Sequence, residues 1–205
     1  KAYITKSPFF ADSKICQCDD CKMQMISPLP PEDIWDAYNK SYFKNAHGGL
    51  NSSKWVEDYN IGVAKTRLNA FTKYLGEQNV TVRSVLEIGP GQGYFMREFK
   101  DRLPNLDYFV VESDNSVHDE LKHYGADVIS ATDIQKIKPV DAMIATHVLE
   151  HTLNPISFLR HFTSVLRPGG AVFIETPCLD HEYKDLHEPH MLFFEKCTLS
   201  RCFEM

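Results

Sequence analysis

Short apolar runs alternate with amphipathic stretches from Val82 to Glu175. This alternation is typical of βα units, in which each buried strand is followed by a helix that crosses back over the sheet. The nearly continuous apolar run at 142–145 indicates a strand with both faces covered. The expected strands are 84–88, 108–112, 127–130, 141–145 and 171–175, with helices at 94–100, 117–124 and 156–166. We therefore predict an α/β fold with a doubly wound, mostly parallel sheet.

The chain before this pattern divides at a proline-rich segment, which reads Pro-Leu-Pro-Pro at 28–31. Prolines at this density interrupt regular structure. The side-chain spacing over 32–44 and 55–75 then predicts two helices, with a glycine-containing loop at 45–49. We predict a Cys-containing N-terminal segment with its linker, residues 1–31, and a main domain, residues 32–205.

Composition and charge narrow the class of protein. A chain of 205 residues can bury one sizeable core, and 43% hydrophobic and 24% charged residues are ordinary for a soluble protein. No stretch approaches the roughly 18 consecutive apolar residues that span a bilayer, so no membrane partner is expected. A net charge of -6 argues against nucleic acid, which needs a dense Lys and Arg surface. A small-molecule substrate is the expected partner.

The first predicted strand runs into a glycine-rich loop, and 85–93 read Val-Leu-Glu-Ile-Gly-Pro-Gly-Gln-Gly. Doubly wound folds bind ligands at the carboxyl ends of the strands, so this loop must let the backbone approach the ligand. Three glycines supply that room: Gly89, Gly91 and Gly93. A dinucleotide site needs a small residue where this chain has Tyr94, and Glu87 would repel a pyrophosphate. Spacing and charge therefore disfavour NAD.

The arrangement Glu-x-Gly-x-Gly-x-Gly resembles motif I of class I S-adenosylmethionine (SAM)-dependent methyltransferases. Residues 141–151 look like the fourth strand and following loop of this family, and 166–177 look like its Leu-x-Pro-Gly-Gly turn and fifth strand. The resemblance implies a Rossmann-like fold, SAM as cofactor, and methyl transfer to a small oxygen or carbon acceptor such as a sugar or related metabolite. The alternatives are an NAD-dependent oxidoreductase or epimerase, and a noncatalytic methyltransferase-like assembly module.

The resemblance also assigns cofactor contacts. Glu112, which ends the second predicted strand, would bind the ribose hydroxyls, a feature that NAD enzymes share. Asp133 resembles the residue that contacts the adenine amino group, or it caps a helix. The full predicted set is Glu87, Gly89, Gly91, Gly93, Glu112, Asp133 and, on the methionine side, His147.

Histidines near the strand ends are the candidate catalytic residues. The loop 181–190 follows the fifth predicted strand, so it either overhangs the pocket or is an ordinary polar surface loop. We predict that three histidines align the acceptor or remove its proton: His151, His187 and His190.

One group of candidate ligands has the spacing i, i+3, i+4, which places His147, Glu150 and His151 on one face of a helical turn. This spacing is similar to the Glu-x-x-Glu-His element of ubiquinone-biosynthesis O-methyltransferases and small-RNA 2′-O-methyltransferases, which use a divalent ion to orient acceptor hydroxyls. Histidine in the first position disfavours a hard ion such as Mg²⁺. The alternative is that Glu150 and His151 line or brace the pocket.

Three of the six cysteines are close together in the N-terminal segment: Cys16, Cys18 and Cys21. Two thiolates in a Cys-x-x-Cys turn can hold one tetrahedral ion, so these residues are candidate zinc ligands, or they are free thiols of a frayed terminus. The segment resembles the end of the zinc lobe of sugar C-methyltransferases, although the earlier cysteine pair of that family is absent. Clustered thiols favour a reducing, cytoplasmic location.

The C-terminal end carries one further expectation. Class I methyltransferases complete their sheet with two strands after the helix that 197–203 are expected to begin. We expect this chain to lack those two strands, so that it is either a fragment or has an oligomer partner that covers the open edge of the sheet.

Overall fold

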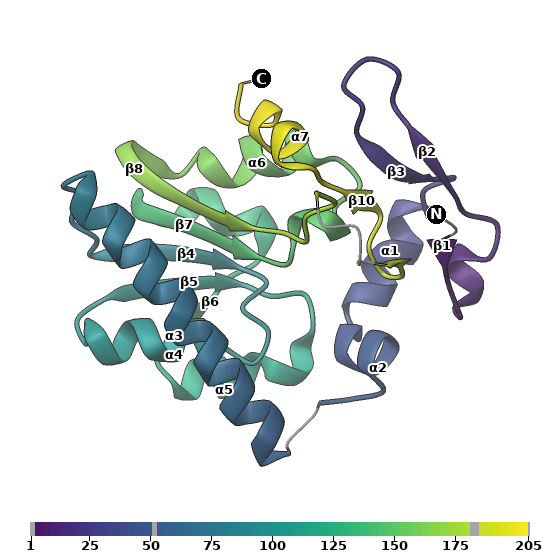
Figure 1. Cartoon of the computed structure of the whole chain (residues 1–205). Helices are drawn as coiled ribbons and strands as arrows, with labels where there is room; N and C mark the ends of the chain where they lie inside the picture. The colour runs from purple at the N-terminus through teal and green to yellow at the C-terminus, as the bar shows by residue number, and fades with distance from the viewer. Residues whose placement is uncertain (1–2, 51–52, 181–184, 205) are drawn as a thin grey trace.

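The computed structural model describes residues 3–50, 53–180 and 185–204. Within these residues the main sheet is parallel and five-stranded, with the order β6-β5-β4-β7-β8 (Figure 1). Its strands are β4 (Ser84–Ile88), β5 (Asp107–Val111), β6 (Asp127–Val128), β7 (Val140–Thr146) and β8 (Leu166–Glu175). The predicted doubly wound α/β fold is confirmed.

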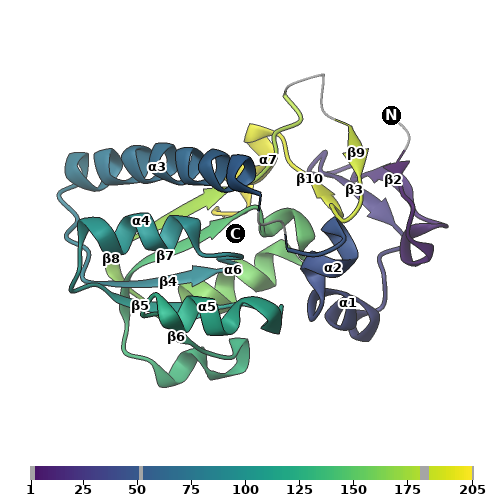
Figure 2. The same cartoon turned by 90° about the horizontal axis from the view of Figure 1, so that it is seen from below.

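Helices cover both faces of this sheet. Successive side chains of a strand point to opposite faces, so the apolar side chains of one strand pack into two separate layers. On β7, Ile144 belongs to one hydrophobic layer and Met143 to the other. The first layer contains side chains of α3 (Lys54–Glu77), α4 (Tyr94–Arg102) and α5 (His118–His123), and Figure 2 shows α3 and α4 side by side. The second contains side chains of α6 (Pro155–Thr163), α7 (Lys196–Arg201) and the 3-10 helix Ala131–Lys136.

Several predicted boundaries were wrong for tertiary or capping reasons. The helix expected at 156–166 ends at Thr163, because Leu166 already pairs with Val140 and the Pro-Gly-Gly residues extend β8. The strand expected at 127–130 stops at Val128, because the Ser130 side chain accepts a hydrogen bond from the backbone of the next 3-10 helix. The helix expected at 117–124 is preceded by a 3-10 turn, Asn115–Val117.

The segment before the prolines forms a hairpin that joins the loop after β8. Strands β2 (Lys14–Gln17) and β3 (Gln24–Ser27) pair antiparallel, and β3 also pairs with β10 (Leu192–Phe193). Strand β1 (Tyr3–Ile4) pairs with β9 (Leu186–His187). A third hydrophobic cluster, which includes Phe10 of the 3-10 turn Pro8–Phe10 and Trp35, packs these strands against the helix that follows.

The helix expected at 32–44 is two helices, α1 (Glu32–Asn39) and α2 (Tyr42–His47), separated by Lys40 and Ser41. Both lie beyond the ends of the central strands (Figure 2). The chain leaves β4 for β5 and β6 on one side and later returns to β7 on the other. A reversal of this kind opens a crevice at the carboxyl ends of the strands, where doubly wound folds bind ligands.

Two remaining features concern partners. Strand β8 is an edge of the sheet in the described part of the chain, and its coverage by another copy stays a prediction. Across residues 3–50, 53–180 and 185–204, no helix is both long and apolar enough to cross a membrane.

Candidate active site

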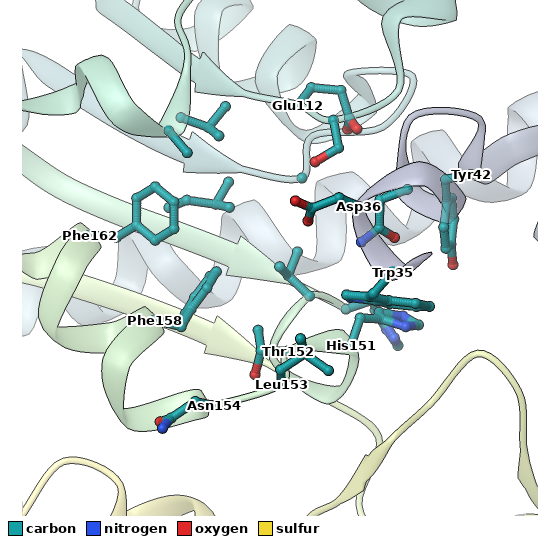
Figure 3. Close-up of a pocket in the computed structure, with 18 of the residues that line it drawn as sticks. Trp35, Asp36, Tyr42, Glu112, His151, Thr152, Leu153, Asn154, Phe158 and Phe162 are labelled. Atoms are coloured by element: carbon teal, nitrogen blue, oxygen red, sulfur yellow. The ribbon is translucent and has the colours of Figure 1, made fainter. Parts of the chain in front are cut away.

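A cavity of about 450 Å³ lies at the ends of β4 and β7, beside α1 and α2 (Figure 3). A second cavity, of about 460 Å³, continues it past Glu112, because Asp36, Asn39 and Glu112 line both. Each volume is in the range of small-molecule sites. We call the two cavities together the groove.

Acidic side chains dominate the ionic character of the first cavity. Among the lining residues that the structure describes are three carboxylates, Glu32, Asp36 and Glu112, no Lys or Arg, and one histidine with a raised pKa, His147. A concave wall with this sign of charge attracts cations and repels phosphates. SAM carries an ammonium and a sulfonium, whereas a dinucleotide carries a pyrophosphate. The cavity therefore fits SAM and disfavours NAD.

The glycine-rich loop after β4 forms one wall of the groove. Gly89 has φ +64°, and a Cβ atom there would stand 2.6 Å from Val148 Cγ2. The Gly89 N–H donates to the Val111 carbonyl at 2.8 Å, and the Gly91 N–H donates to Glu112 Oε2 at 3.0 Å. Only glycine fits at position 89 without a shift of the loop.

Glu112 lies where the sequence predicts a ribose-binding carboxylate. Its Oε1 accepts the Asp114 N–H at 2.9 Å. The Asp114 side chain accepts the Phe43 N–H at 2.9 Å, and this bond joins α2 to the loop after β5. Burial raises the pKa of Glu112, although the backbone donors oppose the shift. Each carboxylate oxygen has two lone pairs, so Glu112 keeps capacity for ligand hydroxyls.

Two predicted cofactor residues lie outside both cavities. Glu87 is 1% exposed and accepts a hydrogen bond from Tyr108 Oη at 2.7 Å, beneath the glycine-rich loop. Asp133 pairs with Lys136 at 2.9 Å on the 3-10 helix, and Ser130 and Ala131 line the second cavity instead. Contacts of Glu87 and Asp133 with the cofactor stay predictions.

The buried position of Glu87 predicts a pH dependence of stability. Burial raises its pKa from 4.5 to about 7, so the folded chain binds a proton that the unfolded chain releases. The proton contributes about 3 kcal/mol to the unfolding free energy. This stabilisation is complete below about pH 4.5 and is lost as the pH rises through 7. In Glu87→Gln the loss between pH 5 and pH 8 is expected to shrink by that order. Urea unfolding of both proteins at the two pH values measures it, and identical pH dependence in both would contradict the assignment.

Two predicted histidines, His147 and His151, line the cavity. His147 leaves β7 with φ 57°, and its two nitrogens lie 3.2 Å from Glu150 Oε1 and 3.1 Å from Glu175 Oε1. These carboxylates raise the pKa of His147 to about 9, so His147 is a cation at neutral pH. The His151 ring lies nearly parallel to the Trp35 ring, with centroids 6.5 Å apart (Figure 3), and burial lowers the pKa of His151.

The other two predicted catalytic histidines lie outside the cavity lining, with His190 next to His151 and His187 next to His190. The His190 ring centroid is 5.0 Å from that of His151 and 4.9 Å from that of His187. Burial, together with the neighbouring His151, lowers the pKa of His190 to about 3, so His190 is neutral. His187 is exposed. Residues 181–184 of this loop lie outside the described residues.

The predicted zinc ligands lie on the N-terminal hairpin. Cys16 is exposed on β2, while Cys18 and Cys21 are half-buried in the turn that follows. Backbone donors of Cys21 and Asp20 lower the pKa of the Cys18 thiol. Among the described residues, the sulfur atoms of these three cysteines do not gather within 4.8 Å of one another. Zinc at this position stays a prediction.

Aromatic side chains at the groove were missed by the sequence interpretation. Trp35, Tyr42 and Phe43 reach it from α1 and α2, and Phe158 and Phe162 reach it from α6. Their helical spacing predicted the helices but not the face that the side chains occupy. Only the tertiary placement of α1 and α2 across the strand ends makes them part of the site.

A family model described as "Methyltransferase domain" matches residues 62–203. The chain belongs to this methyltransferase family. It is a class I SAM-dependent methyltransferase domain, which confirms the family, the enzyme class and the cofactor that the sequence predicted. The matched residues include β4 with its glycine-rich loop, Glu112, and the neighbouring His151 and His190.

Two curated relatives are tRNA U34 carboxymethyltransferases. The protein of Pseudoalteromonas translucida is 30% identical over 105 residues, which cover 46% of this chain and 32% of the relative. The protein of Campylobacter curvus is 24% identical over 181 residues, which cover 80% of this chain and 58% of the relative. The chain thus spans less than two thirds of either relative.

Solved structures share the fold at low sequence identity. A methyltransferase in complex with the Haloferax volcanii Trm112 activator has a TM-score of 0.55 and 16% identity, over 83% of this chain and 74% of that chain. Coclaurine N-methyltransferase bound to N-methylheliamine and SAH has a TM-score of 0.53 and 17% identity, over 83% and 56%.

Proposed function

We propose that this methyltransferase binds SAM along the groove and transfers its methyl group to a small oxygen or carbon acceptor, such as a sugar or related metabolite. The observation that carries the proposal is the groove itself. Its first cavity carries carboxylates together with aromatic side chains and two histidines, and it continues past Glu112 into the second cavity. The carboxylates suit a cationic cofactor, and the part lined by Trp35, Tyr42 and His151, which we call the acceptor end, suits an uncharged acceptor.

The groove offers a position for each part of SAM. Backbone of the glycine-rich loop faces the groove at Gly89 and Gly91, and Glu112 offers oxygen acceptors for the ribose hydroxyls. The second cavity, lined by Ser130 and Ala131 among others, has room for the base. His147, at the end of β7, would lie on the methionine side.

The reaction needs an aligned acceptor more than it needs an activated donor. SAM supplies an electrophilic methyl carbon: the acceptor atom bonds to it, the carbon–sulfur electron pair stays on sulfur as a thioether, and the acceptor releases its proton. Holding the two reactants in line removes a large entropic part of the barrier. Trp35 and Tyr42 pack around the His151 ring, with Tyr42 edge-on at 5.7 Å, and so fix it beside the acceptor end.

The curated relatives raise RNA as a second class of acceptor. Two features favour the small acceptor for this chain. The net charge is -6, and the first cavity is lined by carboxylates, whereas RNA binding depends on basic side chains that neutralise phosphates.

Transfer of a labelled methyl group separates the two acceptor classes. Purified protein is incubated with SAM labelled in its methyl group and with a cell extract, which is then divided into a small-molecule fraction and an RNA fraction. We expect the label in the small-molecule fraction, at a level lost in Glu112→Ala. Enzyme-dependent label in the RNA fraction alone would contradict the small acceptor.

A further inference from the structure

We propose that Glu150, His151 and His190 form a binding site for one divalent transition-metal ion of the zinc type, at the acceptor end of the groove. One oxygen of Glu150 and one nitrogen of each histidine all lie within 4.8 Å of one another. Two imidazoles and one carboxylate form a donor set that suits Zn²⁺ and similar ions better than Mg²⁺. The binding of the ion is independent of the proposed methyl transfer, and only its role rests on that function.

The Glu150 carboxylate is the first indication of a cation. The side chain is 1% exposed, and its Oε2 accepts the Thr176 hydroxyl at 3.0 Å. Its Oε1 lies 3.2 Å from His147 Nδ1, as an ion pair, and 4.0 Å from His151 Nε2. A carboxylate buried among imidazole nitrogens is a typical partner of histidine in binding a metal ion. Oε1 is therefore placed to bind an ion, in competition with the His147 imidazolium.

The orientation of His151 is the second indication. Its Nδ1 lies 3.2 Å from the Pro189 carbonyl oxygen, which can only accept, so Nδ1 carries the proton and Nε2 keeps its lone pair. Nε2 lies 4.0 Å from Glu150 Oε1. Ligand atoms that share one ion at about 2.1 Å stand about 3 to 4 Å apart, so small side-chain rotations bring them to bonding distance. Imidazole ligands with the second nitrogen bonded to a carbonyl are typical of metal sites.

The N-terminal hairpin holds the third ligand in place. The Met191 N–H donates to the Glu150 carbonyl at 2.8 Å, directly after His190. The two residues that follow form β10, which pairs with β3 of the hairpin. This pairing fixes a residue forty positions away in sequence beside Glu150, and it gives the N-terminal segment a role in the site.

The site connects to the groove through His151, which belongs to both. A coordination position that the three side chains leave open would take water or an acceptor hydroxyl. A bound divalent ion lowers the pKa of such an oxygen, so the site favours an oxygen acceptor over a carbon acceptor.

Zinc titration of chelator-treated protein tests this proposal. The background is Cys18→Ser/Cys21→Ser, so that the hairpin thiols take no part, and calorimetry with ZnCl₂ gives affinity and stoichiometry. We expect one ion per chain, and a loss of affinity of at least about 10-fold in Glu150→Gln and in His190→Ala. His187→Ala is the matched control, since its ring adjoins His190 outside the three-ligand group, and it is expected to bind zinc as the background does.

No saturable zinc binding in the background protein would overturn the proposal, and so would equal losses in His187→Ala and His190→Ala. Thermal unfolding of each variant shows whether it is folded, and His190→Ala decides the outcome if Glu150→Gln is not. SAM affinity is measured on the same samples. SAM binding without zinc binding overturns the metal site alone, whereas zinc binding without SAM binding overturns the proposed methyl transfer alone.

Discussion

Replacing Glu112 with alanine is expected to weaken SAM binding by about 10- to 100-fold, the range for hydrogen bonds to a charged group. Glu112 borders both cavities, and its carboxylate also accepts the N–H groups of Gly91 and Asp114. The substitution therefore removes the acceptor for the ribose hydroxyls and releases the glycine-rich loop. Calorimetric titration with SAM measures the change.

Two further variants show whether the loss is specific to Glu112. Glu112→Gln keeps the shape but removes the charge and one acceptor, so we expect an intermediate affinity. Glu77→Ala removes an exposed carboxylate at the end of α3, which forms a surface ion pair with Lys73, and it is expected to leave SAM affinity unchanged. Wild-type affinity in Glu112→Ala would exclude Glu112 from the cofactor site.

Gly89→Ala is expected to lower SAM affinity more than 10-fold and to destabilise the fold by about 1–3 kcal/mol. The new Cβ atom would stand 2.6 Å from Val148 Cγ2, at a backbone φ of +64° that side chains rarely adopt. The loop must shift, and with it the Gly91 N–H that Glu112 accepts. SAM titration and urea unfolding report the two effects.

Gly62→Ala is the matched control for this substitution. Gly62 lies inside α3, and a Cβ atom there meets nothing within 4 Å. Alanine favours a helix interior over glycine by about 1 kcal/mol, so this variant is expected to be slightly more stable and to bind SAM normally. Equal SAM affinity in both alanine variants would show that the contact of the loop with Val148 does not shape the site.

Local signals in the sequence were sufficient for the central strands and the loop after β4. The apolar runs of β4 and β7 and the glycines between 89 and 93 determine structure locally, so the sequence alone predicts the strands and the turn. The start of β8 was misplaced because Leu166 pairs with Val140, a tertiary contact with no local signal. Pairing of this kind overrides helical pattern.

The sequence predicted less of the candidate site than of the fold. Strand alternation places Val85 and Glu87 on one face of β4 and Leu86 on the other. This period could have shown that Glu87 faces the layer of α3, α4 and α5 and not the groove. The convergence of His151 with His190 had no such signal. It depends on the pairing of β3 with β10, between segments at opposite ends of the chain.

Equilibrium binding of SAM, compared with NADH in the same calorimetric experiment, tests the central claim most directly. The acidic cavity and the glycine-rich loop predict saturable binding of one SAM per chain and no measurable heat from NADH. Tight NADH binding together with no binding of SAM would contradict it.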